Sequence, residues 1–369
     1  MDGQSQTPQS QSESVIMQDQ DVVQEQGRGN GQRTCLLTRL SSRAKRGIPI
    51  AATTLVFLIT MTACTQEKTS AASQGQQTSE ATKSEPKLTV PSGPPPQVSG
   101  ERALQYTKEV VAFGPRYVSS PGHKKVEDYL RSKLKSDNLE EDRFTATTPN
   151  GNFPMTNFIA KFPGTKDGIV VLAGHYDTIY NRKDFVGAND AGSSTGLLLA
   201  LADELRTQLK GGKREGYSVW LVWLDGEEAF QHWTDTDSTY GSRNLADRWS
   251  QDGTARKVKG LILADMIGDA DLAIEQDEYS TRWLQEAIYQ AASSLGYQSH
   301  FFRRDAAILD DHLPFVKAGI PAVDLIDFDY GYGNAFWHTP EDTLDKLSPK
   351  SFEIVGKVML QTVRMLDAK

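Results

Sequence analysis

Cysteine is almost absent from this sequence of 369 residues. The chain has only two, Cys35 and Cys64, and both precede the part of the sequence with a globular pattern. A disulfide, a catalytic thiolate and a cysteine metal ligand are therefore excluded from that part. An excess of positive charge is also lacking, because the formal net charge is −8. This charge argues against nucleic acid as a partner.

The apolar run near the N-terminus is too short to cross a membrane as a helix. It reads IPIAATTLVFLITMTAC over residues 48–64, whereas a spanning helix needs roughly 20 apolar residues; a signal-peptide core is shorter. Its end, Met61-Thr62-Ala63-Cys64, resembles the lipobox of bacterial lipoproteins. We therefore expect export to the periplasmic side of a bacterial cell envelope and a lipid anchor at Cys64. An ordinary signal peptide and an uncleaved membrane anchor are the alternatives.

Composition divides the chain into four segments. Residues 1–46 are rich in Gln, Ser and Gly, which is typical of a disordered segment that cannot offset its own ordering entropy. Residues 47–64 form the signal segment with its lipobox. Residues 65–98 are rich in Ser, Thr, Gln and Pro and are expected to form a flexible linker. Residues 99–369 have the pattern of one globular domain.

Strand-like and helical patterns alternate through that domain. The expected strands contain the runs RFTATT, TNFIAKF, GIVVLAG, YSVWLVWL, KGLILADMI and IPAVDLIDF. The expected helices span 101–113, 121–134, 192–209, 242–249, 281–295 and 348–366. The later strands are continuous apolar runs, as in parallel strands covered on both faces, and the first two suit an antiparallel edge. We predict an α/β fold: one domain with a mixed, mostly parallel sheet sandwiched by helices.

Potential metal ligands follow the apolar runs of this sheet. His175 ends one run, with Asp177 two residues later; the pair Glu227 and Glu228 follows another, and Asp265 ends a third. Asp190 opens a helix, and His338 follows a glycine-rich loop after the last run; these are the remaining two candidates. Because ligands of open α/β sheets bind beyond the carboxyl ends of parallel strands, we expect these side chains to converge.

Imidazole and carboxylate ligands without cysteine suit an open zinc site. Each residue alone has an ordinary explanation: Asp190 could be a helix cap, and paired glutamates usually lie in a solvated loop. Together, five such explanations would have to coincide. A cation also explains the crowding of carboxylates in DGEE, because it neutralises charges that otherwise repel. Adjacent Glu227 and Glu228 could divide the work between base and ligand, and Asp177 is expected to orient the His175 imidazole.

The motifs resemble those of a known enzyme superfamily. GHYDT, GANDAGSSTG, DGEEAF, the Asp265 segment and the final His338 resemble the zinc aminopeptidases of phosphorylase/hydrolase-like topology. Other stretches are similar to the glutaminyl-peptide cyclotransferases, or glutaminyl cyclases. These are FVGAND, DGEEAFQHW, DSTYGSRNLA, ILDDHLPFVKAGIPAVDLI and FWHTPEDTLDKL.

This resemblance implies a zinc-dependent acyltransferase that converts the N-terminal Gln of peptides or proteins to pyroglutamate and releases ammonia. It implies that one catalytic zinc is held by Asp190, Glu228 and His338, and that Glu227 is the general acid and base. It further implies that the carboxylate pair Asp265 and Asp310 supports Glu227. Two tryptophans, Trp233 and Trp337, are implied to shape the substrate pocket.

Two departures keep other functions open. GANDAGSSTG is closer to the aminopeptidases, and the cysteine pair of the animal cyclases is absent, with Gly174 before His175. A two-zinc aminopeptidase would hold its second ion with His175, Asp190 and Asp265. A peptide-binding lipoprotein without turnover is the remaining alternative, although an intact Glu227 speaks against it.

Overall fold

The computed structural model describes residues 88–369, so the predictions for the disordered lead, the signal segment and Cys64 lie outside the described residues. Residues 88–98, which the sequence assigns to the linker, pack on the domain. Leu88 and Val98 are buried in the main core, and the Arg364 guanidinium donates to the Pro94 carbonyl at 2.6 Å. Within the described residues, the packed part of the chain therefore includes residues 88–98 as well as the predicted domain from Ser99, because the apolar side chains of this segment join the main core.

The main sheet has six strands in the order β1-β2-β4-β3-β5-β8. Their bounds are Leu139–Thr148, Gly151–Phe162, Arg214–Leu224, Gly164–His175, Val258–Asp265 and Ala322–Ile326, in that spatial order. β3, β4, β5 and β8 run parallel, and β1 and β2 form an antiparallel hairpin at one side. The predicted mixed, mostly parallel sheet with an antiparallel edge is confirmed.

Seven α-helices are present in residues 88–369. They are α1 Gly100–Val111, α2 Pro121–Leu134, α3 Gly192–Gln208, α4 Tyr240–Asp252, α5 Arg282–Ser294, α6 His312–Lys317 and α7 Pro349–Asp367. α2 and α7 begin as the sequence predicts. Each has a serine cap whose side chain accepts a backbone N–H, followed by a proline in the first turn, where the missing N–H costs nothing.

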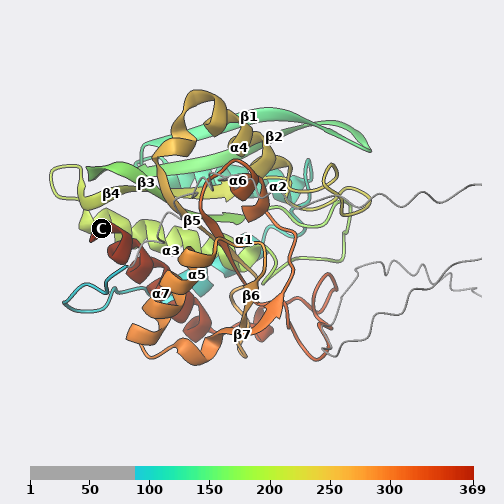
Figure 1. Cartoon of the computed structure of the whole chain (residues 1–369). Helices are drawn as coiled ribbons and strands as arrows, with labels where there is room; N and C mark the ends of the chain where they lie inside the picture. The colour runs from blue at the N-terminus through green and yellow to red at the C-terminus, as the bar shows by residue number, and fades with distance from the viewer. Residues whose placement is uncertain (1–87) are drawn as a thin grey trace, which may run out of the picture. The chain divides into compact units, whose positions relative to one another are not determined.

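Two hydrophobic clusters cover the two faces of the sheet. Along β3, Val170 and Leu172 pack with α1, α2, α3, α5 and α7, whereas Val171 and Ala173 pack with α4 and α6. Figure 1 shows α3, α5 and α7 below the sheet and α4 above it. This alternation on a strand that is buried on both faces explains why the sequence showed an uninterrupted apolar run.

The sequence did not predict the smaller elements. β6 (Ile274–Asp277) and β7 (Phe301–Ala306) form a separate two-stranded sheet, and three short 3₁₀ helices cover Thr254–Lys257, Gln298–His300 and Leu344–Lys346. These elements are three to six residues long. Such lengths are too short for a periodic pattern to distinguish them from loops.

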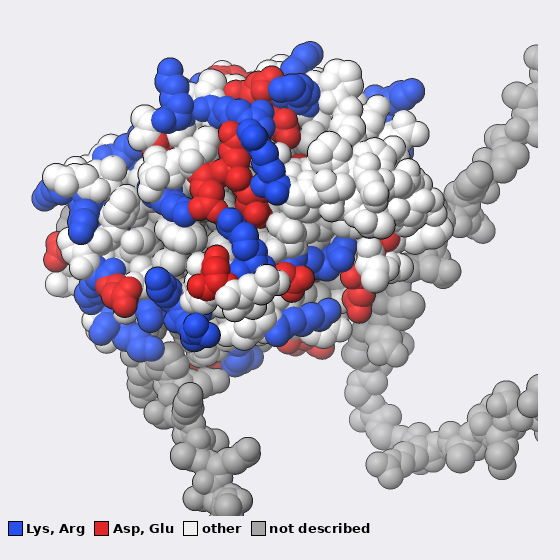
Figure 2. Space-filling model, turned by 90° about the horizontal axis from the view of Figure 1, so that it is seen from above, with Lys and Arg blue, Asp and Glu red and all other residues white. Residues whose placement is uncertain are grey.

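Charges on the upper face of the domain largely compensate one another. Figure 2 shows Lys and Arg side chains lying among Asp and Glu on this face. On β1, Glu140 lies 2.5 Å from Arg248, and Glu141 lies 3.0 Å from Arg131. Among residues 88–369, no helix has both the length and the apolar character of a membrane span.

Candidate metal centre

The candidate ligands meet at the carboxyl end of the parallel strands. His175 is the last residue of β3 and Asp265 is the last residue of β5, while Glu228 follows β4 by four residues. Asp190 lies just before α3, and His338 lies in the segment after β8. The predicted convergence of five separate segments is therefore present in the structure.

Asp190, Glu228 and His338 form one group of possible metal ligands. Their ligand atoms all lie within 4.8 Å of one another. His338 Nε2 is 3.3 Å from Asp190 Oδ2 and 3.5 Å from Glu228 Oε1. Both carboxylates are buried, and Glu228 Oε1 has no hydrogen-bond partner. A cation would supply the interaction that this buried oxygen lacks.

A second group shares Asp190 with the first. It consists of His175, Asp190 and Asp265, again with ligand atoms within 4.8 Å. His175 Nε2 is 3.1 Å from Asp265 Oδ1 and 3.3 Å from Asp190 Oδ1. The two Asp190 oxygens therefore face different groups. The structure places together the ligand set for one ion and the additional residues that a second ion would need.

The electrostatics of the centre fit a divalent cation. Burial raises the pKa of Glu228 to about 7 and that of Asp265 to about 6, with the charges of neighbouring aspartates adding to the effect. Burial alone would lower the pKa of His338, but the Glu228 and Asp190 carboxylates raise it to about 10. These groups therefore bind protons more tightly than ordinary carboxyl and imidazole groups do, and a cation would compete with those protons.

Glu227 belongs to neither ligand group and lies beside both. Its carboxylate is buried and sits 3.7 Å from His175 Nδ1. Burial, opposed by His175 and reinforced by Glu228 and Asp310, raises its pKa well above the ordinary value. A carboxyl group in such surroundings holds a proton readily and can pass it on.

Asp177 supports the ligands in two ways, one of which the sequence predicts. Its Oδ1 lies 3.6 Å from His175 Nδ1, within ion-pair distance. Its two oxygens also accept the backbone N–H groups of Glu227 at 3.1 Å and Glu228 at 3.3 Å. The expected contact with the imidazole is therefore present, and the same carboxylate also holds the DGEE turn.

Asp342 is a supporting residue that the sequence analysis missed. Its carboxylate accepts the backbone N–H groups of Asn189 at 2.8 Å and Asp190 at 3.1 Å, and the Tyr330 hydroxyl at 2.8 Å. Burial and the nearby Asp190 charge raise its pKa to about 7. Asp342 lies four residues after His338 in the FWHTPEDTLDKL stretch, but no pattern along the chain pairs it with Asp190.

Arg116 braces the same loop from the other side. It is fully buried and donates to the carbonyls of Tyr176, Val186 and Gly187 at 3.2, 2.6 and 2.8 Å. Burial lowers its pKa to about 10, although nearby aspartates oppose the change. The loop that carries Asp190 is therefore held at both ends by buried charged groups.

Asp310 lies close to this centre within a cluster of unpaired polar atoms. Its charge raises the pKa of Asp265, as expected for the predicted carboxylate pair, whose function stays a prediction. The ligand atoms of Asp310, His312 and Asp324 lie within 4.8 Å of one another. All three residues are buried; Asp310 Oδ2 and both Asp324 oxygens lack a hydrogen-bond partner, whereas His312 Nε2 lies 2.9 Å from Asp277 Oδ2.

Asp324→Asn is expected to leave the protein folded and functional. Burial and the neighbouring Asp310 raise the pKa of Asp324 well above its ordinary value, which favours the neutral form of this carboxyl group, and an amide of the same shape can replace that form. We expect kcat within about threefold of wild type, less than ~1 kcal/mol in barrier. Steady-state kinetics and thermal unfolding, with Asp324→Leu as the variant that cannot hydrogen-bond, would test this. A loss in Asp324→Asn as large as in Asp324→Leu would contradict the neutral form.

The two predicted substrate tryptophans lie in different surroundings. Trp337 stacks on His338 with ring centroids 4.0 Å apart and also contacts Phe328 at 4.9 Å. Trp233 lines a cavity of about 450 Å³ between α4 and α6, together with Asp310. Trp337 is not among the residues lining that cavity. Trp337 therefore covers a proposed metal ligand, and Trp233 borders the space next to Asp310.

Comparisons with known proteins agree with this geometry. The model of peptidase family M28 matches residues 157–363, which contain every candidate ligand. A Drosophila melanogaster glutaminyl-peptide cyclotransferase is 31% identical over 252 residues, covering 62% of this chain and 70% of that protein. The chain belongs to the glutaminyl-peptide cyclotransferases of family M28.

Solved structures support this assignment to the glutaminyl cyclases. An Acidobacteriales bacterium glutaminyl cyclase is 45% identical with a TM-score of 0.72, covering 76% of this chain and 99% of that one. A Zn-dependent exopeptidase from Parabacteroides distasonis shares the fold with a TM-score of 0.63 at 24% identity, covering 73% and 99%. The cyclotransferase family and the imidazole and carboxylate ligands together indicate zinc as the metal.

Proposed function

We propose that this protein is a glutaminyl cyclase that converts the N-terminal glutamine of peptides or proteins to pyroglutamate and releases ammonia. The observation that carries the proposal is a buried carboxyl group outside both ligand groups, Glu227, beside a ligand group drawn from three distant segments. The relatives at 31% and 45% identity are a cyclotransferase and a glutaminyl cyclase, whereas the exopeptidase at 24% identity shares the fold alone. They favour neither the aminopeptidase nor the binding protein without turnover.

One zinc ion held by Asp190, Glu228 and His338 fits these residues best. Glu228 Oε1 is buried without a hydrogen bond and has only the 3.5 Å contact with His338 in this group, whereas His175 and Asp265 already hydrogen-bond each other at 3.1 Å. Zinc bound by three protein ligands supplies a Lewis acid that polarises a carbonyl group. The residues of the second group then serve as hydrogen-bond partners around the centre.

Glu227 performs the proton transfers of the reaction. The free α-amine of the substrate attacks the γ-carbonyl carbon of its own side chain, so that a C–N bond forms within one residue. Glu227 accepts the proton that the amine loses and delivers it to the departing amide nitrogen, which leaves as ammonia. Atoms balance without water, and the protein mainly has to hold the side chain in a folded conformation.

Asp265 and Asp310 support this proton transfer, and the tryptophans shape the space for the substrate. The buried Asp310 carboxylate raises the proton affinity of both Glu227 and Asp265, which favours a base that takes up the amine proton and holds it until it is delivered to the departing amide nitrogen. Trp233, beside Asp310 in the same cavity, offers a flat apolar wall for the methylene groups of glutamine.

Incubation with a peptide that begins with glutamine tests the proposal. We expect the peptide to lose the mass of one ammonia molecule, as measured by mass spectrometry, because the amine and the amide react within one residue. The same peptide with an acetylated N-terminus should remain unchanged, since it lacks the nucleophile. A shortened peptide would instead identify an aminopeptidase, and no change in either peptide would leave only binding.

A further inference from the structure

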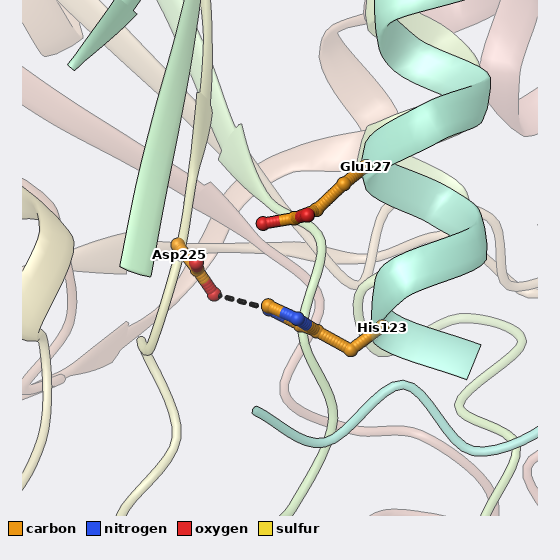
Figure 3. A group of neighbouring side chains, drawn as sticks. All are labelled: His123, Glu127 and Asp225. Carbon is orange, nitrogen blue, oxygen red and sulfur yellow. Dashed lines mark hydrogen bonds and ion pairs between the residues drawn. The ribbon is translucent and has the colours of Figure 1, made fainter. Parts of the chain in front are cut away.

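A buried ion pair lies directly beneath the DGEE turn and is not part of the metal centre. His123 Nε2 on α2 is 2.7 Å from Asp225 Oδ1, and both side chains are buried. Figure 3 shows His123 and Glu127 reaching from α2 toward Asp225, with the dashed contact joining His123 to Asp225. Asp225 is the first residue after β4, so it starts the turn that carries Glu227 and Glu228.

Asp225 ties three parts of the fold together. Besides His123, its carboxylate accepts the Thr156 backbone N–H on β2 at 2.8 Å. Its own N–H donates to Asn157 Oδ1 at 3.0 Å. The side chain is thus held from α2 and β2 at once. The following residue, Gly226, has a positive φ of 67°, so the chain turns sharply here and the direction of the turn depends on how its first residue is fixed.

The imidazole is itself held rigidly. Its ring stacks on Tyr176 with centroids 5.4 Å apart and planes at 28°, and Tyr176 follows the candidate ligand His175. The Tyr176 hydroxyl donates to the Thr156 carbonyl at 2.9 Å. His123 therefore contacts both segments that leave the parallel strands for the metal centre, the ends of β3 and of β4.

The group is an ion pair rather than another metal site. His123, Glu127 and Asp225 have atoms within 4.8 Å of one another, but the 2.7 Å contact is a charge-assisted hydrogen bond. Two ligands of a tetrahedral zinc lie about 3.3 Å apart. Glu127 is only partly buried and lies 3.4 Å from Arg131. Burial would lower the pKa of His123, but the Asp225 charge raises it, consistent with an imidazolium.

We infer that His123 is a positioning residue for cyclisation: through Asp225 it fixes the turn from which Glu227 and Glu228 project. The expected effect of His123 on turnover rests on the proposed function, whereas its expected effect on zinc affinity does not. Without the imidazole, Asp225 Oδ1 would be a buried carboxylate oxygen with no partner, and the turn would move to reach water. Small displacements of an aligned base reduce turnover strongly.

The test compares His123→Leu, which removes the donor, with His123→Gln, whose amide can donate from nearly the same place as Nε2. At saturating zinc, we expect His123→Leu to lower kcat by about 10- to 100-fold with KM changed by less than about threefold. Zinc affinity, measured by competition with a chromophoric chelator, should fall by about tenfold because Glu228 shares the turn. His123→Gln should recover at least about half of the decrease in the logarithm of kcat that His123→Leu causes.

Two further variants keep the result interpretable. Asp225→Asn should lower kcat and zinc affinity in the same direction, and combining it with His123→Leu should add little, because both remove one interaction. His300→Gln, which removes an imidazole bonded to the Leu272 carbonyl at 3.0 Å, should leave kcat and zinc affinity at wild-type values. If His123→Leu does not fold, Asp225→Asn and His123→Gln provide the same comparison.

Wild-type kcat and zinc affinity in folded His123→Leu, with only a lower melting temperature, would overturn the inference and leave a purely structural ion pair. Equal losses in the Leu and Gln variants would also overturn it, because the donor to Asp225 would then not matter. A wild-type protein that cyclises no glutaminyl peptide would refute the proposed function alone. In that case the chelator competition still decides whether His123 positions the turn.

Discussion

Glu227→Gln is expected to abolish cyclisation while leaving zinc bound. The amide has the same shape as the carboxyl group but cannot accept the amine proton and return it to the departing ammonia, so the loss in kcat should be on the order of 10²- to 10⁴-fold. Glu227 belongs to neither ligand group, and its backbone N–H to Asp177 does not depend on the side chain. Zinc content and melting temperature should therefore stay close to those of the wild type.

Glu228→Gln is the matched control, because it makes the same chemical change one residue later. Glu228 lies in the ligand group with Asp190 and His338, so this variant should lose zinc affinity, and added zinc should restore part of its activity. The measurements are kcat and the metal-to-protein ratio for each variant. Turnover of Glu227→Gln within about tenfold of wild type would remove Glu227 from its proposed role, and loss of its zinc would make it a ligand instead.

The ends of the parallel strands explain how much of the site the sequence could predict. An apolar run that stops at a histidine or a carboxylate identifies both a buried strand and the residue at its end, so His175, Glu228 and Asp265 were found together with β3, β4 and β5. Parallel strands bring these ends to one edge of the sheet by construction. The convergence thus follows from the pattern alone.

Contacts between backbone and side chain could not be predicted in this way. Asp177 and Asp342 accept N–H groups from segments 50 and 153 residues away along the chain, respectively, and no periodicity encodes such pairs. No pattern along the chain singles out His123, because its contact with Asp225 joins positions 102 residues apart. Short elements such as β6 and β7 were missed because their patterns do not repeat.

Removal of zinc is expected to reduce cyclisation to background, and one equivalent of zinc should restore it fully. Without the cation, the buried carboxylates of Asp190 and Glu228 have only His338 as a counter-charge within their group, and Glu228 Oε1 has no partner. The melting temperature of the dialysed, chelator-treated protein should therefore rise on adding zinc, because the ion binds only the folded state.

The stoichiometry of that titration separates one-ion from two-ion chemistry. The Asp190 carboxylate faces His338 through Oδ2 and His175 through Oδ1, so the fold could accommodate either arrangement. The 3.1 Å hydrogen bond between His175 and Asp265 satisfies the second group without an ion, whereas no such bond satisfies Glu228 Oε1. His338→Ala should consequently resist reactivation at one equivalent of zinc, and His175→Gln should be reactivated at one equivalent. A need for two equivalents in the wild-type protein would contradict the one-ion arrangement, because both groups would then have to be filled before turnover begins.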